Sequence, residues 1–220
     1  MRYKRITLLA GHYGSGKTNI AVNMALDLRK SRERVAIADL DIVNPYYRTL
    51  DSKEALDAAG VRLIVSHFAN SNLDIPALPQ DMYAVVDDRE LSCIIDVGGD
   101  DSGAVALGRL SPRIREENDY DMLLVINKYR PLTPDAESIF EVMKEIEAAS
   151  HLKFTGIMNN SNLGIDTTAE TVLSSLKYAE SCAQKTGLPV FATSIEASLE
   201  PELRGKIPDL FPMKLQKRPV

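Results

Sequence analysis

The chain has 220 residues, of which 45% are apolar and 26% are charged, and this composition suits one globular domain with a substantial core. Its formal net charge of −5 argues against a dedicated nucleic-acid binder, because a phosphate backbone requires a basic face. The two cysteines, Cys93 and Cys182, form no CxxC motif, which argues against a zinc or iron–sulfur site within one chain. We expect both to be buried free thiols in a reducing cytoplasm.

No apolar run approaches the ~20 residues that a membrane-spanning helix needs. The basic start is followed by an apolar run too short for the core of a signal peptide, so the sequence predicts a cytoplasmic protein. Residues 206–220 mix basic and apolar side chains in the way of a membrane-binding amphipathic helix. Because Pro208, Pro212 and Pro219 would interrupt such a helix, we expect a docked or frayed tail instead.

Short apolar runs typical of buried strands alternate with segments of helical periodicity along the chain. Strands are predicted over residues 5–10, 34–40, 61–66, 92–97, 121–127, 154–158 and 189–193. Helices are predicted over residues 18–30, from Thr133 to about 149, and from Thr167 to near Gly187. This alternation is typical of a three-layer α/β fold, in which helices cover both faces of a mostly parallel sheet of about seven strands.

Two of these helices carry start signals. Thr133 is predicted to be an N-cap because Pro134 follows it at the first helical position. Thr167, with Glu170 three residues later, is predicted to form a capping box.

Only residues 44–88 lack a clear pattern, and we expect short helices and functional loops there. No repeat and no linker divides the chain, so the sequence predicts one domain over residues 1–220.

Residues 11–19 read GHYGSGKTN and satisfy the spacing of a P-loop, between a predicted strand and a predicted helix. Glycines let such a loop point its main-chain N–H groups at an anion, and the helix start adds the positive end of its dipole. Lys17 is expected to reach the β- and γ-phosphates, and the Thr18 hydroxyl to bind Mg²⁺. The nucleotide-binding residues predicted from this motif are Gly11, Gly14, Ser15, Gly16, Lys17, Thr18 and Asn19.

Acidic residues end two of the predicted strands. RVAIADLD ends on Asp39 and Asp41, which lie two residues apart and so on one face of an extended chain. LSCIIDVGG ends its strand on Asp96, followed by Gly98 and Gly99. Carboxylates at the carboxyl ends of strands lie in the crevice where open α/β sheets bind ligands. Asp96 is expected to hold Mg²⁺ through water, as a Walker B residue does, and the glycines to let a switch segment approach the γ-phosphate.

A P-loop, a DxD strand end and an apolar strand closing in Asp together resemble the MinD/ParA group of P-loop ATPases, within the class that includes signal-recognition GTPases and the nitrogenase iron protein. The resemblance covers about residues 5–195. It implies that Asp41 orients the attacking water, that Asp39 supports the metal shell, and that Asp96 is the Walker B carboxylate. The metal-site residues predicted together are Thr18, Asp39, Asp41 and Asp96. It also implies an asparagine that reads adenine after the strand ending near residue 158, where Asn159 and Asn160 both stand and Asn160 is preferred.

The chain departs from the family pattern at one position of the P-loop. Members of the family usually carry a second lysine after the first loop glycine, and that lysine reaches the nucleotide of a partner subunit. Here the position is His12, which is shorter and mostly neutral at pH 7. The nucleotide-dependent homodimer of the family therefore remains open, and Arg48 is the nearest alternative cation in the sequence.

The choice between ATP and GTP depends on the stretch INKYR. Guanine-reading proteins use Asn-Lys-x-Asp, whose aspartate accepts two hydrogen bonds from the base. Here Asn127 and Lys128 match, but Arg130 replaces the acceptor. ATP with Mg²⁺ is therefore favoured over GTP.

Three uses of the nucleotide are considered. The favoured one is a switch ATPase that changes its affinity for a protein partner on hydrolysis. The second is a small-molecule kinase or ligase resembling dethiobiotin synthetase, with residues 44–88 as a substrate lid. The third, a sensor without catalysis, is disfavoured by the presence of Asp41.

Overall fold

Eight parallel strands form one sheet in the computed structural model, which describes residues 3–40, 52–65, 78, 80–99 and 101–215. The strands lie in the order β3-β2-β4-β1-β5-β6-β7-β8, and every neighbouring pair is parallel. Their bounds are β1 Ile6–Ala10, β2 Val35–Leu40, β3 Arg62–Val65, β4 Ser92–Val97, β5 Tyr120–Ile126, β6 Gly156–Asn159, β7 Val190–Glu196 and β8 Leu210–Met213.

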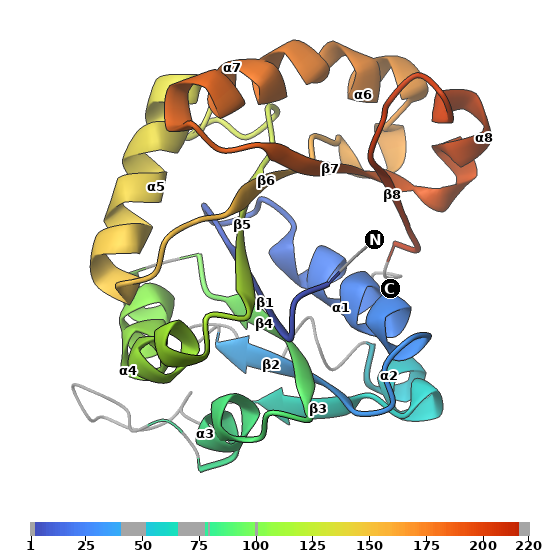
Figure 1. Ribbon diagram of the computed structural model, residues 1–220. Coiled ribbons are helices and arrows are strands. Elements are labelled where there is room, and N and C mark those ends of the chain that lie inside the picture. Colours follow the sequence, from blue (N-terminus) through green and yellow to red (C-terminus); the bar gives the residue numbers. More distant parts are fainter. Residues whose placement is uncertain (1–2, 41–51, 66–77, 79, 100, 216–220) are drawn as a thin grey trace.

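Helices connect the strands and cover both faces of the sheet (Figure 1). Their bounds are α1 Lys17–Arg29, α2 Lys53–Ala59, α3 Gln80–Asp87, α4 Asp101–Glu117, α5 Ala136–Ser150, α6 Ala169–Ser174, α7 Leu176–Thr186 and α8 Glu200–Leu203. The predicted α/β class and the three-layer arrangement are therefore confirmed.

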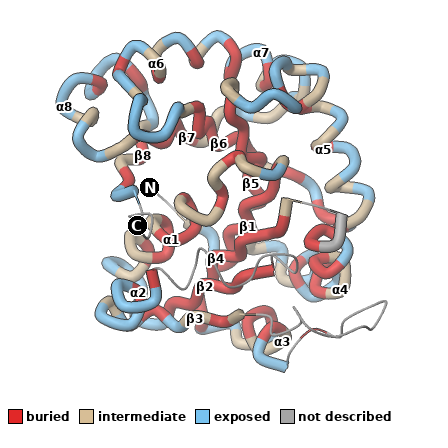
Figure 2. The backbone as a smooth tube through the Cα atoms, turned by 180° about the vertical axis from the view of Figure 1, so that it is seen from behind, coloured by how far each residue is buried: buried red, intermediate tan, exposed pale blue. Residues whose placement is uncertain are grey.

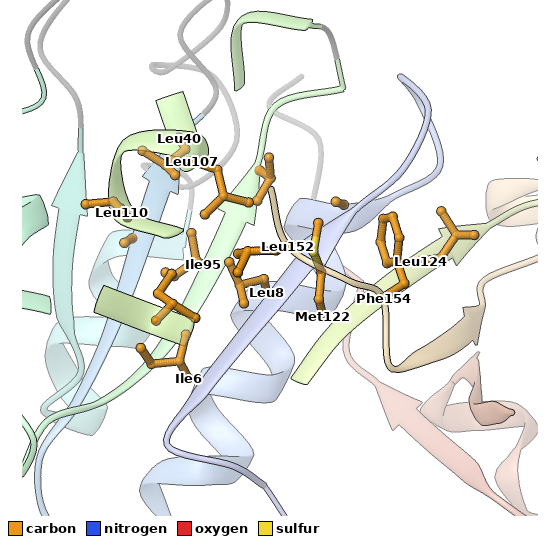
Figure 3. Close-up of a cluster of buried hydrophobic side chains, with 14 of the residues drawn as sticks. Ile6, Leu8, Leu40, Ile95, Leu107, Leu110, Met122, Leu124, Leu152 and Phe154 are labelled. Atoms are coloured by element: carbon orange, nitrogen blue, oxygen red, sulfur yellow. The ribbon is translucent and has the colours of Figure 1, made fainter. Parts of the chain in front are cut away.

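The two faces of the sheet are packed separately because successive residues of a strand point to opposite sides. On β1, Ile6 and Leu8 belong to the larger hydrophobic cluster, with side chains of α3, α4, α5 and α7. Leu9 belongs to a second cluster, with side chains of α1 and α2. Figure 3 shows part of the larger cluster, where Leu8 lies among Ile95, Leu107 and other apolar side chains.

The central strands are buried along their whole length (Figure 2). All residues of β1, β2 and β4 are buried, which explains why these strands appear in the sequence as continuous apolar runs rather than as alternating patterns. β1 lies between β4 and β5, so the loop after it opens at the centre of the sheet. This is the position where open α/β sheets bind ligands.

The predicted N-cap at Thr133 is wrong, because the helix α5 begins two residues later. Asp135 is the cap, and its carboxylate accepts a hydrogen bond of 2.9 Å from the Ser138 main-chain N–H. That bond and the Ser138 hydroxyl lower the pKa of Asp135. Thr133 instead lies buried in the preceding turn, where its carbonyl accepts a hydrogen bond from the Tyr178 hydroxyl.

The predicted capping box at Thr167 is also displaced. Thr168 caps α6, in a box with Thr171 in place of Glu170. The Thr167 hydroxyl is already engaged, because it donates a bond of 2.6 Å to the Gly164 carbonyl. The segment expected to be one helix consists of α6 and α7, and α7 ends at Gly187 as predicted.

The tail contributes a strand that the sequence did not predict, so the sheet has eight strands rather than seven. β8 pairs with β7, and Thr193 and Leu210 are partners in the register. Its outer edge is covered near the end, because the Asn23 side chain accepts a hydrogen bond from the Lys214 N–H and donates one to its carbonyl. Pro212 supplies no N–H to this edge, which also protects it from pairing with another strand.

Within residues 44–88, short elements are present as expected, namely α2, β3 and α3. Asp41 and Arg48 lie outside the described residues. None of the described helices is long and apolar enough to cross a membrane.

Candidate functional site

The loop from Gly11 to Gly16 joins the buried end of β1 to the first turn of α1. The helix begins after Gly16, whose φ of 93° lies in the left-handed region that favours glycine. Gly16 provides no side-chain cap, and the first turn of α1 contains no acidic residue. The helix start therefore combines uncapped main-chain donors with the positive end of the dipole, which suits an anion.

The ammonium group of Lys17 lies inside this loop. The side chain is buried, and Nζ donates hydrogen bonds of 3.0 Å to the Gly11 carbonyl and 3.3 Å to the His12 carbonyl. The loop is thus wrapped around a positive charge. His12 itself is half-buried, and its Nδ1 lies 3.0 Å from the Tyr13 carbonyl.

The other residues of the motif are distributed around the same turn. Gly11 lies against the main chain of Val125 on β5, and Gly14 lies beside the exposed side chain of Arg130. Ser15 is buried, and its hydroxyl has no hydrogen-bond partner among the described residues. Thr18 and Asn19 are half-buried in the first turn of α1.

Two carboxylates lie side by side at the same edge of the sheet. Asp39 on β2 and Asp96 on β4 are partners in the parallel register, and their exposed fractions are only 3% and 2%. Two residues before these carboxylates on the same strands are Ile37 and Ile94, and both isoleucines pack in the hydrophobic cluster with α1. Because side chains alternate along a strand, both carboxylates point to the α1 side of the sheet, toward the helix that begins at Lys17.

The segment after Asp96 touches the P-loop. A Cβ atom added to Gly99 would lie 2.7 Å from the Cα of Tyr13 and 3.0 Å from Nζ of Lys17. The loop after β4 therefore lies in direct contact with the loop after β1, and a residue larger than glycine at position 99 would displace it.

The donors fit a magnesium ion that is shared with phosphate groups. Two carboxylates at neighbouring strand ends need a positive charge nearby, because burying like charges together is costly. The described residues contain no cluster of three or more His, Cys, Asp or Glu side chains that could form a metal site alone. Magnesium commonly takes one or two carboxylates and completes its shell with water and phosphate oxygens. Thr18, Asp39 and Asp96 could hold such an ion, whereas Asp41 lies outside the described residues.

The two candidate adenine-reading asparagines lie at the end of β6 and make different contacts. Asn159 is buried, and its amide donates to the Ser175 hydroxyl and accepts from the Ser161 hydroxyl. Asn160 donates a hydrogen bond of 2.6 Å to the Ser15 carbonyl in the P-loop. Of the two, Asn160 is thus the one that contacts the loop.

Beside Asn160 there is a small pocket of about 20 Å³ between the ends of β6, β7 and β8, which the sequence did not reveal. Its lining includes Asn160, Asn162, Thr167, Ser194, Glu196, Met213 and Leu215. These residues come from three segments that are far apart in the chain, and no local motif marks them. Only the strand order brings them together.

The stretch INKYR forms hydrogen bonds that stabilise the loop after β5, among the residues that the structure describes. The Asn127 side chain accepts a hydrogen bond from the Tyr129 N–H, and the Tyr129 hydroxyl donates to the Thr171 carbonyl. Lys128 donates to the Ser174 carbonyl. The loop after β5 is therefore fastened to α6, whereas Arg130 extends toward Gly14.

The two thiols are buried and free, as expected from the sequence. Burial raises the pKa of Cys93 to about 12 and that of Cys182 to about 11. Neither thiol is a nucleophile at neutral pH.

A family model described as the CobQ/CobB/MinD/ParA nucleotide-binding domain matches residues 6–197 of the chain. The match includes the P-loop, both buried carboxylates and both asparagines. A search of curated proteins found no significant match.

Solved structures that resemble the chain share its fold. FtsY from Mycoplasma mycoides superposes with a TM-score of 0.56 at 18% identity, over 88% of this chain and 60% of that one. FtsY from Thermotoga maritima superposes with a TM-score of 0.57 at 18% identity, over 86% of this chain and 61% of that one. The 54 kDa signal recognition particle protein from Aeropyrum pernix K1, in complex with GDP, superposes with a TM-score of 0.53 at 18% identity, over 87% of this chain and 41% of that one. The chain thus spans less than two thirds of the length of each of these structures.

Proposed function

Because the chain belongs to the CobQ/CobB/MinD/ParA family of nucleotide-binding domains, we propose that it is a Mg²⁺-dependent P-loop ATPase of MinD/ParA type. It hydrolyses ATP to change its own conformation and thereby its affinity for a partner. The observation that carries the proposal is the buried pair Asp39 and Asp96, in register on the α1 side of the sheet, at the edge where the P-loop surrounds Lys17.

The phosphates bind at the start of α1 in this proposal. Main-chain N–H groups of residues 11–19 surround them, and Lys17 exchanges its carbonyl partners for the β- and γ-phosphates. Thr18, Asp39 and Asp96 would hold Mg²⁺, which when bound would supply positive charge beside the transferred phosphoryl group. Asp41 orients the attacking water, as the family resemblance implies. It follows the end of β2 by one residue.

The base lies beside Asn160 at the end of β6, and adenine is the proposed base. The pocket there has a volume of about 20 Å³, which admits a water molecule and not a purine. Arg130 stands in the stretch INKYR where a guanine-reading motif has an acceptor, and its side chain extends toward the P-loop. GTP remains the alternative, because the amide of an asparagine such as Asn160 can pair with the edge of either purine.

Switching is favoured over chemistry on a metabolite because the loop after β4 touches the P-loop. A change at the γ-phosphate can reach α4 through Gly99, since α4 begins at Asp101. The partner is a protein in this reading, and a second copy of the chain is one candidate. The alternative, a small-molecule kinase or ligase, would place its substrate under residues 44–88.

Calorimetry with ATP and GTP in the presence of Mg²⁺ tests the proposal. The wild-type protein should bind ATP more tightly, and Lys17→Ala should lose binding. Lys30→Ala is a matched control, because Lys30 follows the last turn of the same helix and its ammonium pairs with Asp27. If Lys17→Ala bound Mg-ATP with unchanged affinity, the assigned site would be wrong.

Hydrolysis distinguishes the two uses of the nucleotide. A switch should show slow basal turnover that rises with a protein partner or with protein concentration. A metabolic enzyme should turn over only when its substrate is added. Asp41→Asn should retain ATP binding and lose hydrolysis in either case.

A further inference from the structure

We propose that Asn160 is a positioning residue that fastens the P-loop to the ends of β6 and β7, so that the phosphate-binding loop is held in shape before nucleotide arrives. The inference rests on the proposed nucleotide binding and assigns to Asn160 a role beyond reading the base. It concerns one side chain at the junction of β1, β6 and β7.

The amide of Asn160 connects three segments. Nδ2 donates a hydrogen bond of 2.6 Å to the carbonyl of Ser15, which is 145 residues away in the chain. Oδ1 accepts a hydrogen bond of 2.6 Å from the Ser194 hydroxyl at the end of β7. Asn160 and Ser194 are each only 3% exposed, so water does not compete strongly for these bonds.

The last glycine of the P-loop is adapted to this contact. A Cβ atom added to Gly16 would lie 2.2 Å from Nδ2 of Asn160, closer than any real contact allows. The absence of a side chain at Gly16 therefore admits the amide to the Ser15 carbonyl. The motif glycine and the asparagine form one unit, although the sequence separates them widely.

The amide retains capacity for a ligand. An asparagine side chain offers two N–H donors and two acceptor lone pairs, and the bonds to Ser15 and Ser194 use one of each. Asn160 also lines the pocket between β6, β7 and β8. That pocket has a volume of about 20 Å³, enough for one water molecule but not for a purine, so a base can reach the remaining pair through a bridging water. Coupling of this kind is reciprocal between the base and the phosphates.

Tripolyphosphate separates this role from base reading, because it carries the phosphates of ATP without a base. Asn160→Ala leaves the Ser15 carbonyl without its partner, which costs enough free energy to loosen the loop. We expect this variant to bind Mg-tripolyphosphate about tenfold more weakly than the wild type. A residue that only reads the base would leave the tripolyphosphate affinity unchanged.

Two serine variants provide a matched pair. Ser194→Ala removes the hydroxyl that orients the Asn160 amide, whereas Ser175→Ala removes the hydroxyl that accepts from Asn159. Both serines are buried, so the two variants should lose similar stability. We expect Ser194→Ala to weaken tripolyphosphate binding several-fold and Ser175→Ala to leave it unchanged.

The measurement is displacement of a fluorescent ATP analogue by Mg-tripolyphosphate and by Mg-ATP, on the folded wild type and the three variants. The proposal is supported if Asn160→Ala and Ser194→Ala weaken binding of both ligands. It is overturned if they weaken only Mg-ATP, if Ser175→Ala has the same effect, or if tripolyphosphate fails to displace the analogue from the wild type. If the wild type binds neither the analogue nor Mg-ATP, it is the proposed function that fails. Should Asn160→Ala not fold, Ser194→Ala against Ser175→Ala decides.

Discussion

Asp39 and Asp96 are direct neighbours across β2 and β4, and both are almost completely buried. Neighbouring strands lie about 4.8 Å apart, so two carboxylates share one small volume at the carboxyl edge of the sheet. A divalent cation bound there with phosphate, as proposed above, would compensate both charges. Metal binding and nucleotide binding should therefore depend strongly on each other.

Asp96→Asn tests this dependence. In the wild type, Mg²⁺ should strengthen ATP binding, and the variant should lose about tenfold of that gain because one ligand charge is gone. Calorimetry with Mg²⁺ and with EDTA measures the difference. Asp121→Asn is the control, since Asp121 lies near the amino end of β5, away from the carboxyl ends of the strands, and accepts a hydrogen bond from the Thr155 hydroxyl. An Asp96→Asn variant with the full Mg²⁺ effect would contradict the assignment.

Gly99→Ala should impair nucleotide binding through the P-loop. The added methyl group would lie 2.7 Å from the Cα of Tyr13, so the loops after β1 and β4 must separate. Gly108→Ala provides a similar clash elsewhere, 2.8 Å from the carbonyl of Ala149 between α4 and α5. Thermal unfolding should show that both variants are destabilised. Only Gly99→Ala should bind Mg-ATP more weakly, and equal losses would exclude a specific role for the loop contact.

Arg130 should contribute attraction for the phosphates. Its side chain lies beside Gly14, is exposed, and forms no ion pair with other described residues. Arg130→Ala should weaken Mg-ATP binding about threefold at low ionic strength, and added salt should reduce the difference because exposed charges are screened. Arg130→Lys should retain most of the affinity. Arg32→Ala is the control, because Arg32 lies in the loop between α1 and β2, and this variant should not change the affinity for Mg-ATP. A salt-independent loss would indicate packing instead of charge.

The two thiols should report on the folded state. With pKa values raised to about 12 and about 11, Cys93 and Cys182 stay protonated at pH 8 and should not react with a disulfide reagent until the protein unfolds. Mg-ATP should slow the reaction further, because a ligand that binds only the folded state stabilises it. Since the thiolate is disfavoured in the folded state, stability should fall as pH rises above the unfolded value of about 8.5. Rapid stoichiometric labelling of the native protein would contradict this.

Local pattern was sufficient for most of the fold. Seven strands were predicted because each is a short apolar run between helical segments, and burial on both faces produces such runs. β8 was not predicted because its four residues include Pro212 and lie next to a basic stretch. These residues were therefore interpreted as part of a C-terminal tail. The strand forms because β7 pairs with it, and this pairing depends on tertiary structure and not on local sequence.

The candidate site shows the same division. The P-loop and the carboxylates at the strand ends were predicted from residue spacing along the chain. In the structure, Asp39 and Asp96 are register partners on the neighbouring strands β2 and β4. Which of two adjacent asparagines would contact the loop depended on the phase of β6, which no local signal gives. The helix starts were misplaced for a related reason, because Thr133 and Thr167 have competing partners in the turns before α5 and α6.

The central place of β1 has a consequence for how the protein is made. Ile6 pairs with Cys93 on one side and Tyr120 on the other, so β1 has both of its neighbours only after β4 and then β5 have been synthesised. Until then, the apolar segment ITLLA has no sheet to join and is a natural target for chaperones. Such long-range pairing slows folding, and the proposed nucleotide site is complete only after β6 and β7 have joined the sheet, because Asn160 and Ser194 hold its loop.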